Sequence, residues 1–194
     1  MSRSQVSLVY NQATNRYVSE EELYQFAIFQ YQEPQGTDGE TFSGNSQDTY
    51  PLNTEVFSNI DTSFDEINHE IELPKGDYLI EGYITSYHNA SNTSIKMKLY
   101  VRVESSATDL SGACSSNLFY VSQNNQSDYR MNEIAPWINY FSLTERSTIK
   151  LIYRHAPETG STGTQYLGRN ADVGVPGGDN LPEIYGSFKF TKVN

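Results

Sequence analysis

Apolar and polar side chains alternate most clearly in the middle of the chain, from Ile95 to Glu104. Apolar residues occupy the odd positions of this segment, and lysine, tyrosine, arginine or glutamate occupies the even ones. A period of two is typical of a β-strand with one dry face. A second strand candidate, Tyr78 to Tyr87, precedes it across an Asn/Ser-rich connection, residues 88 to 94. The pattern therefore predicts antiparallel sheet in the middle of the chain.

Strand patterns continue along most of the chain, whereas helical periodicity is almost absent. Turn residues at Pro74-Lys75-Gly76-Asp77 and at Thr144-Glu145-Arg146-Ser147 predict two tight hairpins. Long loops are predicted from Glu33 to Asp48 and from Ala156 to Pro182. The nine predicted strands are Phe26 to Tyr31, Asn53 to Ile60, Ile67 to Leu73, Tyr78 to Tyr87, Ile95 to Glu104, Leu118 to Ser122, Trp137 to Leu143, Thr148 to His155 and Glu183 to Lys192.

A chain of 194 residues is expected to fold as one sandwich domain, residues 25 to 194, behind an N-terminal arm, residues 1 to 24. Within the arm, the run Ser19-Glu20-Glu21-Glu22 resembles a capping box and favours a short helix or turn. The arm is either an attachment segment that docks on a neighbour or a frayed terminus. The side chains through which it would attach are Val6, Leu8, Tyr10, Tyr17 and Leu23.

The charge balance of 13 basic against 24 acidic residues gives a net charge of −11. This charge repels phosphate backbones and anionic lipid, so neither nucleic acid nor a membrane is an expected partner. The single cysteine, Cys114, predicts a fold without an intrachain disulfide. The N-terminus lacks the apolar core of a secretory signal, and no apolar run is long enough to cross a bilayer. We therefore expect a chain that is not exported by the usual route.

Catalytic chemistry has no sequence signature here. The three histidines, His69, His88 and His155, lie in strands or at strand ends without a nucleophile elbow or a metalloprotease motif, so we expect no enzyme. The acidic residues between Asp61 and Glu72 supply oxygens of the kind that bind Ca²⁺, but their spacing does not match an EF-hand loop. Solvated strand edges are the competing interpretation. We predict neither a metal nor a cofactor.

The glycine-rich segment from Gly160 to Gly178 lacks the Gly-Lys-Ser/Thr ending of a phosphate-binding loop and precedes a strand instead of a helix. It is interpreted as a mobile surface loop. A loop that mixes aromatic and polar side chains suits contact with a protein neighbour or a glycan, although an unconstrained loop is the simpler alternative. The candidate contact residues are Tyr166, Arg169, Asn170 and Asp172.

Seven short segments, taken together in this order, resemble a family of phage virion proteins. In that family the C-terminal domain is a jelly roll of the tumour necrosis factor and complement-head type. The resemblance covers roughly residues 26 to 194 and rests on the order of the pieces. The segments are Phe26-Ala-Ile-Phe-Gln30, Gly36-Thr-Asp-Gly-Glu-Thr-Phe42, Leu52-Asn-Thr-Glu-Val56, Ile71-Glu-Leu-Pro-Lys-Gly-Asp-Tyr78, Phe141-Ser-Leu-Thr144, Ile149-Lys-Leu-Ile-Tyr-Arg154 and Glu183-Ile-Tyr185.

The resemblance implies an all-β antiparallel jelly-roll sandwich that assembles as a homotrimer. Such proteins decorate capsids, form head fibres, or cap tail fibres and bind host surfaces. Only about two dozen residues precede the first predicted sandwich strand, where a fibre would carry a long shaft. We therefore expect a capsid decoration or fibre-type protein, made in the host cytoplasm and attached through the arm to other virion proteins. The alternative is a receptor- or carbohydrate-binding module at a tail-fibre tip, with a host-surface glycan as partner.

Overall fold

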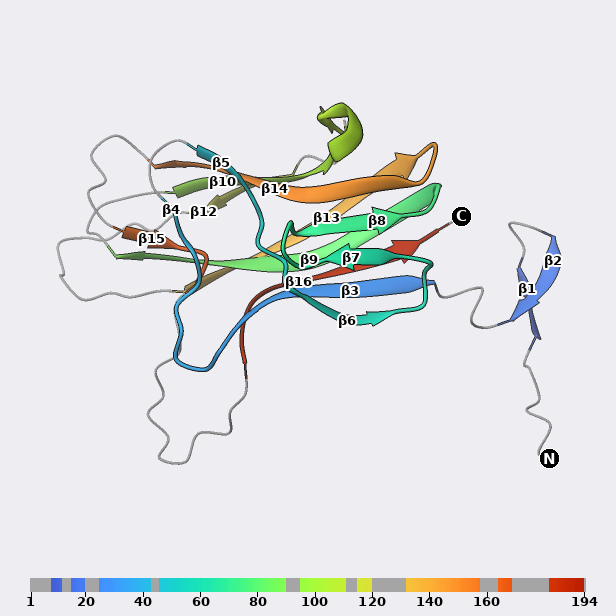
Figure 1. The fold of residues 1–194 in the computed structure, drawn as a ribbon, viewed down its shortest axis with the longest axis horizontal. Helices are drawn as coiled ribbons and strands as arrows, with labels where there is room; N and C mark the ends of the chain where they lie inside the picture. Colours follow the sequence, from blue (N-terminus) through green and yellow to red (C-terminus); the bar gives the residue numbers. More distant parts are fainter. Residues whose placement is uncertain are drawn as a thin grey trace.

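The computed structural model describes residues 8–11, 15–19, 25–42, 46–89, 95–110, 115–119, 132–157, 164–168 and 182–193. These residues form β-strands, their connections and one short 3-10 helix, η1 (Glu104–Ser106) (Figure 1). Within the described ranges, no helix has the length and apolarity that a bilayer-spanning segment needs.

Strands account for most of the described chain. Their bounds are β1 (Leu8–Asn11), β2 (Arg16–Ser19), β3 (Phe26–Glu33), β4 (Thr41–Phe42), β5 (Ser46–Thr49), β6 (Thr54–Ser58), β7 (Ser63–Asp65), β8 (Glu70–Leu73), β9 (Gly76–Asn89), β10 (Ile95–Val103), β11 (Thr108–Asp109), β12 (Ser115–Phe119), β13 (Asn132–Leu143), β14 (Ser147–Pro157), β15 (Thr164–Tyr166) and β16 (Glu183–Lys192).

Two antiparallel sheets face each other and form a sandwich (Figure 1). In the β9 sheet the order is β13-β9-β16-β3, with β6 outside β3 and with β15 and β4 beyond the end of β16. In the β14 sheet the order is β12-β10-β14-β8, with β7 outside β8. The four central strands of each sheet interleave strands that are distant in sequence, and this order defines a jelly roll. The predicted all-β jelly-roll sandwich is therefore confirmed.

The two tight turns connect the sheets, so the prediction of hairpins is wrong. Leu73 pairs with Ser147 in the β14 sheet, whereas Gly76 pairs with Leu143 in the β9 sheet. The β8–β9 turn and the β13–β14 turn therefore both pass from one sheet to the other at the same corner of the sandwich. β9 and β10 also lie in different sheets, although the sequence predicts them as one antiparallel sheet. Turn residues specify where the chain reverses but not which strand becomes the hydrogen-bonded partner.

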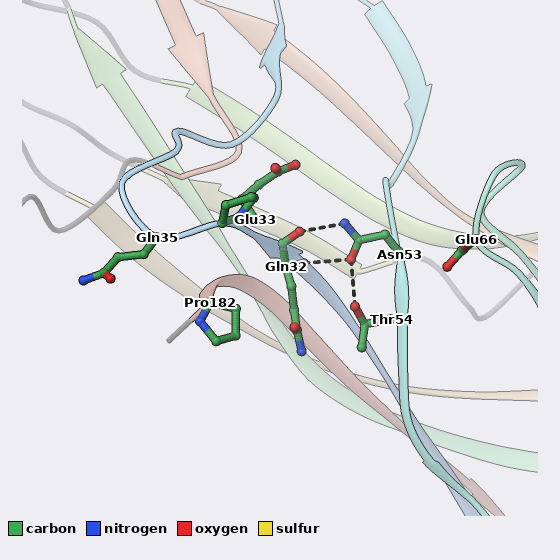
Figure 2. A pocket seen from close by; sticks show the side chains of 8 residues that line it. Gln32, Glu33, Gln35, Asn53, Thr54, Glu66 and Pro182 are labelled. Carbon is green, nitrogen blue, oxygen red and sulfur yellow. Dashed lines mark hydrogen bonds between the residues drawn. The ribbon is translucent and has the colours of Figure 1, made fainter. Parts of the chain in front are cut away.

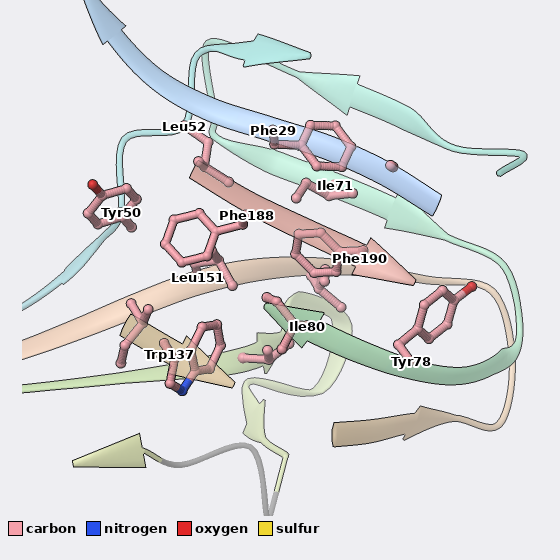
Figure 3. Close-up of a cluster of buried hydrophobic side chains, with 14 of the residues drawn as sticks. Phe29, Tyr50, Leu52, Ile71, Tyr78, Ile80, Trp137, Leu151, Phe188 and Phe190 are labelled. Atoms are coloured by element: carbon pink, nitrogen blue, oxygen red, sulfur yellow. The ribbon is translucent and has the colours of Figure 1, made fainter. Parts of the chain in front are cut away.

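Aromatic rings fill the space between the sheets (Figure 3). Phe29 and Phe190 meet edge to face at 5.8 Å between ring centroids, and Trp137 and Phe188 do so at 5.9 Å. Gly82 lies between these last two rings in the sheet, because it pairs with Trp137 on one side and with Phe188 on the other. A Cβ at Gly82 would lie 2.4 Å from the Ser187 carbonyl oxygen and 2.5 Å from Phe188 Cδ1. The Trp137 and Phe188 rings can therefore pack in this way only because residue 82 has no side chain.

Tyrosines close one end of the core and bind the long loop that follows β3. The Tyr50 hydroxyl donates to the Tyr185 carbonyl oxygen at 2.9 Å, and the Tyr185 hydroxyl donates to the Thr37 carbonyl oxygen at 2.5 Å. The Tyr31 hydroxyl accepts a hydrogen bond from the Glu40 backbone N–H at 2.8 Å. Buried hydroxyls that find backbone partners in this way fix the course of the loop against the sandwich.

Alkaline pH is expected to unfold the protein through these buried phenols. Burial raises the pKa of Tyr78 to about 12, and it also raises the pKa values of Tyr31, Tyr50 and Tyr185 above the ordinary value of about 10. A pKa raised on folding means that stability is complete below about pH 10 and declines as pH rises through the folded-state pKa. Urea unfolding at pH values from neutral to strongly alkaline should give a constant midpoint and then a steep fall above about pH 10.

The Tyr78→Phe variant provides the control for this pH dependence. The Tyr78 hydroxyl donates to the Pro74 carbonyl oxygen at 2.7 Å, so its removal should cost about 1 kcal/mol at neutral pH. Because one titrating phenol is gone, the fall above pH 10 should be shallower in the variant. An alkaline midpoint as high as the neutral one would contradict the expectation.

Candidate functional site

Paired charges lie toward one end of the outer face of the β14 sheet, whereas Tyr100 and Ile152 further along the same face are buried. Lys150 Nζ lies 3.1 Å from Glu70 Oε1 and 3.5 Å from Glu104 Oε2. Arg146 Nη1 lies 2.7 Å from Glu72 Oε1 at the end of the same sheet. Partly exposed pairs of this kind add little stability but keep their part of the sheet solvated. This end of the face therefore has the character of a surface that stays in water.

Four of the five acidic residues between 61 and 72 that were weighed for Ca²⁺ have protein partners, and among the described residues Glu66 is the exception. Arg146 binds both Asp61 and Glu72. Asp65 Oδ1 accepts hydrogen bonds from the backbone N–H groups of Ile67 and Asn68 and so caps a turn. This turn replaces the first residues of the predicted strand Ile67 to Leu73, and β8 begins only at Glu70. Within the described ranges, no three metal-ligating side chains gather.

The outer face of the β9 sheet is apolar along both margins. On β13, the side chains of Ile138 and Tyr140 are 68% and 49% exposed. On β6, Phe57 is 45% exposed, and its ring lies 4.9 Å from that of Phe26. We define the apolar face by its outward residues on β3, β6, β9 and β13, which are Phe26, Ile28, Phe57, Leu79, Ile138 and Tyr140.

One pair of opposite charges crosses the middle of the apolar face. Glu81 pairs with Ile138 on one side and with Lys189 on the other, and Lys189 pairs with Ile28. Lys189 Nζ also lies 5.2 Å from the centre of the Phe26 ring. Contact of these exposed apolar side chains with water is unfavourable, so a partner that covers them would be favoured. The apolar face is therefore a candidate assembly interface.

The N-terminal arm is a β-hairpin that projects from the end of the sandwich (Figure 1). Tyr10 pairs with Tyr17, with 5.3 Å between ring centroids, and the exposed fractions of Leu8, Tyr10 and Tyr17 are 62%, 46% and 69%. An isolated hairpin of two four-residue strands is marginally stable in water, so a surface that covers its apolar side chains would stabilise it. Of the predicted helix or turn from Ser19, only Ser19 is described, and it ends β2; Val6 and Leu23 lie outside the described residues.

A groove of about 670 Å³ lies where β3 ends and β6 begins (Figure 2). The Asn53 side chain binds both backbone groups of Gln32. Its Oδ1 accepts from the Gln32 N–H at 2.9 Å, and its Nδ2 donates to the Gln32 carbonyl oxygen at 2.6 Å. Asn53 therefore continues the β3–β6 ladder with a side chain and fixes the floor of the groove. The lining residues are Gln32, Glu33, Pro34, Gln35, Asn53, Thr54, Glu66 and Pro182.

The predicted contact residues of the glycine-rich loop are only partly described. Tyr166 lies in β15, half-buried, and pairs with Thr41 and Tyr87. Its neighbour Gly168 is buried, and a Cβ there would lie 2.1 Å from Tyr185 Cδ1. This part of the predicted mobile loop is thus packed against the sandwich, which corrects the prediction. Three further candidates, Arg169, Asn170 and Asp172, lie outside the described residues.

Sequence reasoning missed the apolar face, although the sequence carries a signal for it. β13 has apolar residues on both faces: Trp137, Phe141 and Leu143 point into the core, whereas Ile138 and Tyr140 point outward. An amphipathic strand alternates instead, with polar residues on its solvent face. Apolar residues at both alternating sets of positions are typical of a strand covered on both sides; in β13 the core covers one side, and the other side is exposed in the single chain.

The topology defines a jelly-roll β-sandwich, with paired charges on the outer face of one sheet and exposed apolar side chains along the margins of the other. No protein-family model matches the chain, and no curated protein matches it. Solved structures of similar fold include infectious bursal disease virus of the Gt strain (TM-score 0.45, 9% identity) and of the Gx strain (TM-score 0.44, 11% identity). In both, 96% of this chain aligns with just over a third of the viral chain, 37% and 36% respectively. At this level of likeness the comparison defines neither a family nor a function.

Proposed function

We propose that the chain is a structural virion protein of a bacteriophage, a homotrimer that decorates the capsid and attaches to it through the N-terminal arm. The observation that supports this proposal is the contrast between the outer faces. The β14 sheet presents paired charges, and the β9 sheet presents the apolar face. Assembly through the apolar face removes it from water and leaves the charged face as the outer surface.

In this proposal, the apolar face of each copy lies in the seam of a closed ring of three copies. Each copy would contribute its apolar face to the seam, so the same residues are buried three times. Glu81 and Lys189 lie on that face, and opposite charges at a seam favour one register over others. The tumour necrosis factor-like assembly implied by the sequence resemblance is of this closed type.

The arm has a separate role in the proposal. Its exposed Leu8, Tyr10 and Tyr17 would pack on another virion protein, which completes a hairpin that is marginal alone. Aromatic side chains are frequent in the centres of such contacts because they bury a large area with few rotatable bonds. In this proposal the sandwich forms the contacts of the trimer, and the arm binds the trimer to the particle.

Deletion of residues 2 to 24 is the test of this division. Light scattering should give three times the respective chain mass at every concentration measured, which is three times 22.0 kDa for the undeleted chain and three times a smaller mass for the shortened one. Particles assembled with the deleted protein should lack it, whereas particles assembled with full-length protein should carry it. Normal incorporation of the deleted protein would refute the role of the arm, and a monomeric full-length protein would refute the trimer.

A receptor- or carbohydrate-binding module at a tail-fibre tip is the second candidate function. The groove at the end of β3 is the observation that favours it, because the lining combines amide, hydroxyl and carboxylate groups. This candidate does not exclude the first, since the groove and the apolar residues Phe26 and Phe57 lie at opposite ends of β3 and β6.

A further inference from the structure

We propose that the groove between β3 and β6 binds a short neutral oligosaccharide. This inference rests on the second candidate function, the carbohydrate-binding module, and is independent of the homotrimer, because the described residues that line the groove belong to one chain. The volume of about 670 Å³ lies in the range of small-ligand sites. The chemical groups that line the groove, their fixed positions and their charge together indicate the chemical class of the ligand.

The floor of the groove is fixed before a ligand binds. The two hydrogen bonds between Asn53 and the backbone of Gln32 hold the start of β6 against the end of β3. The Asn53 backbone N–H donates to the Gln30 carbonyl oxygen at 3.0 Å and completes this connection. Groups that are already ordered cost less conformational entropy on binding than mobile ones. The groove is thus preorganised on the side where the two strands meet.

Hydrogen-bonding capacity remains at three side chains of the groove. The Thr54 hydroxyl donates to Asn53 Oδ1 at 3.2 Å and keeps its acceptor lone pairs. The Gln32 amide nitrogen donates to Gln30 Oε1 at 2.6 Å, which leaves Gln32 Oε1 as an acceptor. Gln35 is exposed in the turn that the Thr37 N–H closes onto the Pro34 carbonyl oxygen. Amide and hydroxyl groups on a fixed backbone match the adjacent hydroxyls of a sugar, each of which both donates and accepts.

The walls of the groove add apolar surface and negative charge, and the negative charge disfavours anionic ligands. Pro34 and Pro182 line the groove and offer C–H surface to the faces of a sugar ring. Glu33 and Glu66 line it as well, and among the described residues neither forms an ion pair. Two carboxylates in a chain of net charge −11 repel anionic ligands, which include sialylated, sulfated and phosphorylated glycans. The ligand is therefore not anionic, and the amide and hydroxyl groups of the groove suit a neutral ligand rich in hydroxyls.

A glycan array that holds matched neutral and acidic oligosaccharides is the first experiment. We expect signal on neutral glycans and none above background on their sialylated or sulfated counterparts. The neutral oligosaccharide with the strongest signal is then titrated calorimetrically into the full chain and its variants. Thr54→Val and Gln35→Ala should each weaken binding about three- to tenfold, the loss expected for one hydrogen bond.

Thr148→Val is the matched control, because Thr148 is a half-buried strand threonine in β14, in the opposite sheet. It should bind the oligosaccharide as tightly as the unmodified chain. The proposal is overturned if no neutral glycan binds, if acidic glycans bind more tightly, or if both groove variants bind normally. Light scattering on the same samples tests the homotrimer separately, so failure of one proposal is distinguishable from failure of the other.

Discussion

Replacement of Gly82 by alanine is expected to destabilise the sandwich by about 3 kcal/mol or more. The new methyl group would lie 2.4 Å from the Ser187 carbonyl oxygen, a backbone atom of the neighbouring strand that cannot move without disturbing the ladder. It would also meet Phe188, whose ring is fully buried against Trp137. Both neighbours are held on several sides, so the clash is relieved only by separation of β9 from β16. Urea unfolding monitored by tryptophan fluorescence measures the loss.

Gly36→Ala is the appropriate comparison, because it tests a different property of glycine. Gly36 has a φ of +81° and no atom within 4 Å of the position of a new Cβ. Its replacement should cost only about 1 kcal/mol, the strain of a left-handed backbone conformation in a residue with a side chain. If Gly82→Ala costs no more than Gly36→Ala, the close approach at Gly82 is not a constraint on the fold.

Ile138→Asp is expected to convert the proposed homotrimer into folded monomers. Ile138 is 68% exposed in the single chain, so the substitution leaves the core intact. In the trimer, the same carboxylate would be buried in the seam without a partner, at a cost of about 3 kcal/mol or more per copy. The mass from light scattering should fall to the chain value of 22.0 kDa, while the urea midpoint of the monomer stays near that of the unmodified chain measured at high dilution.

Ile67→Asp is the matched control for this substitution. Ile67 is the same residue type and is 82% exposed, but it lies in the turn after β7 and not on the apolar face. The control variant should keep the trimer mass at the concentrations where Ile138→Asp is monomeric. Dissociation of both variants, or of neither, would show that the seam does not pass over Ile138.

Strand positions were predictable because alternation is a local property of the sequence. The structure contains β3, β9, β10, β13, β14 and β16 where the pattern predicts strands, with bounds that differ by a few residues. The short strands β4 and β5 were missed, since each lies in a segment rich in glycine, serine and asparagine that the composition assigns to a loop. Their strand conformation comes from the edges on which they pair, which are β15 and β14.

The partners of the strands were not predictable from the turns. Pro74-Lys75 and Thr144-Glu145-Arg146 have hairpin composition, yet both join one sheet to the other. The reason lies in the core: Leu73 and Leu143, one before each corner, are both buried between the sheets. A chain that bends across the layers there keeps both leucines in the core. Such packing depends on residues far apart in sequence, and no local pattern reports it.

The candidate site was the least predictable part. The predicted contacts were placed in the glycine-rich loop, because composition draws attention to loops. The apolar face and the groove instead combine residues from strands that are far apart along the chain, such as Ile28 with Lys189 and Gln32 with Asn53. Their proximity follows from the jelly-roll strand order and not from spacing in the sequence.

The position of β16 also governs when the protein can fold. This strand lies between β3 and β9 and is hydrogen-bonded to both, so the β9 sheet has a gap until residues 183 to 192 arrive. During synthesis, β3 and β9 leave the ribosome with the strand that joins them still unmade. Contacts that span most of the chain fold slowly and expose unpaired edges in the meantime. Production in a cell therefore depends on how long the nascent chain stays free of aggregation before its last strand is released.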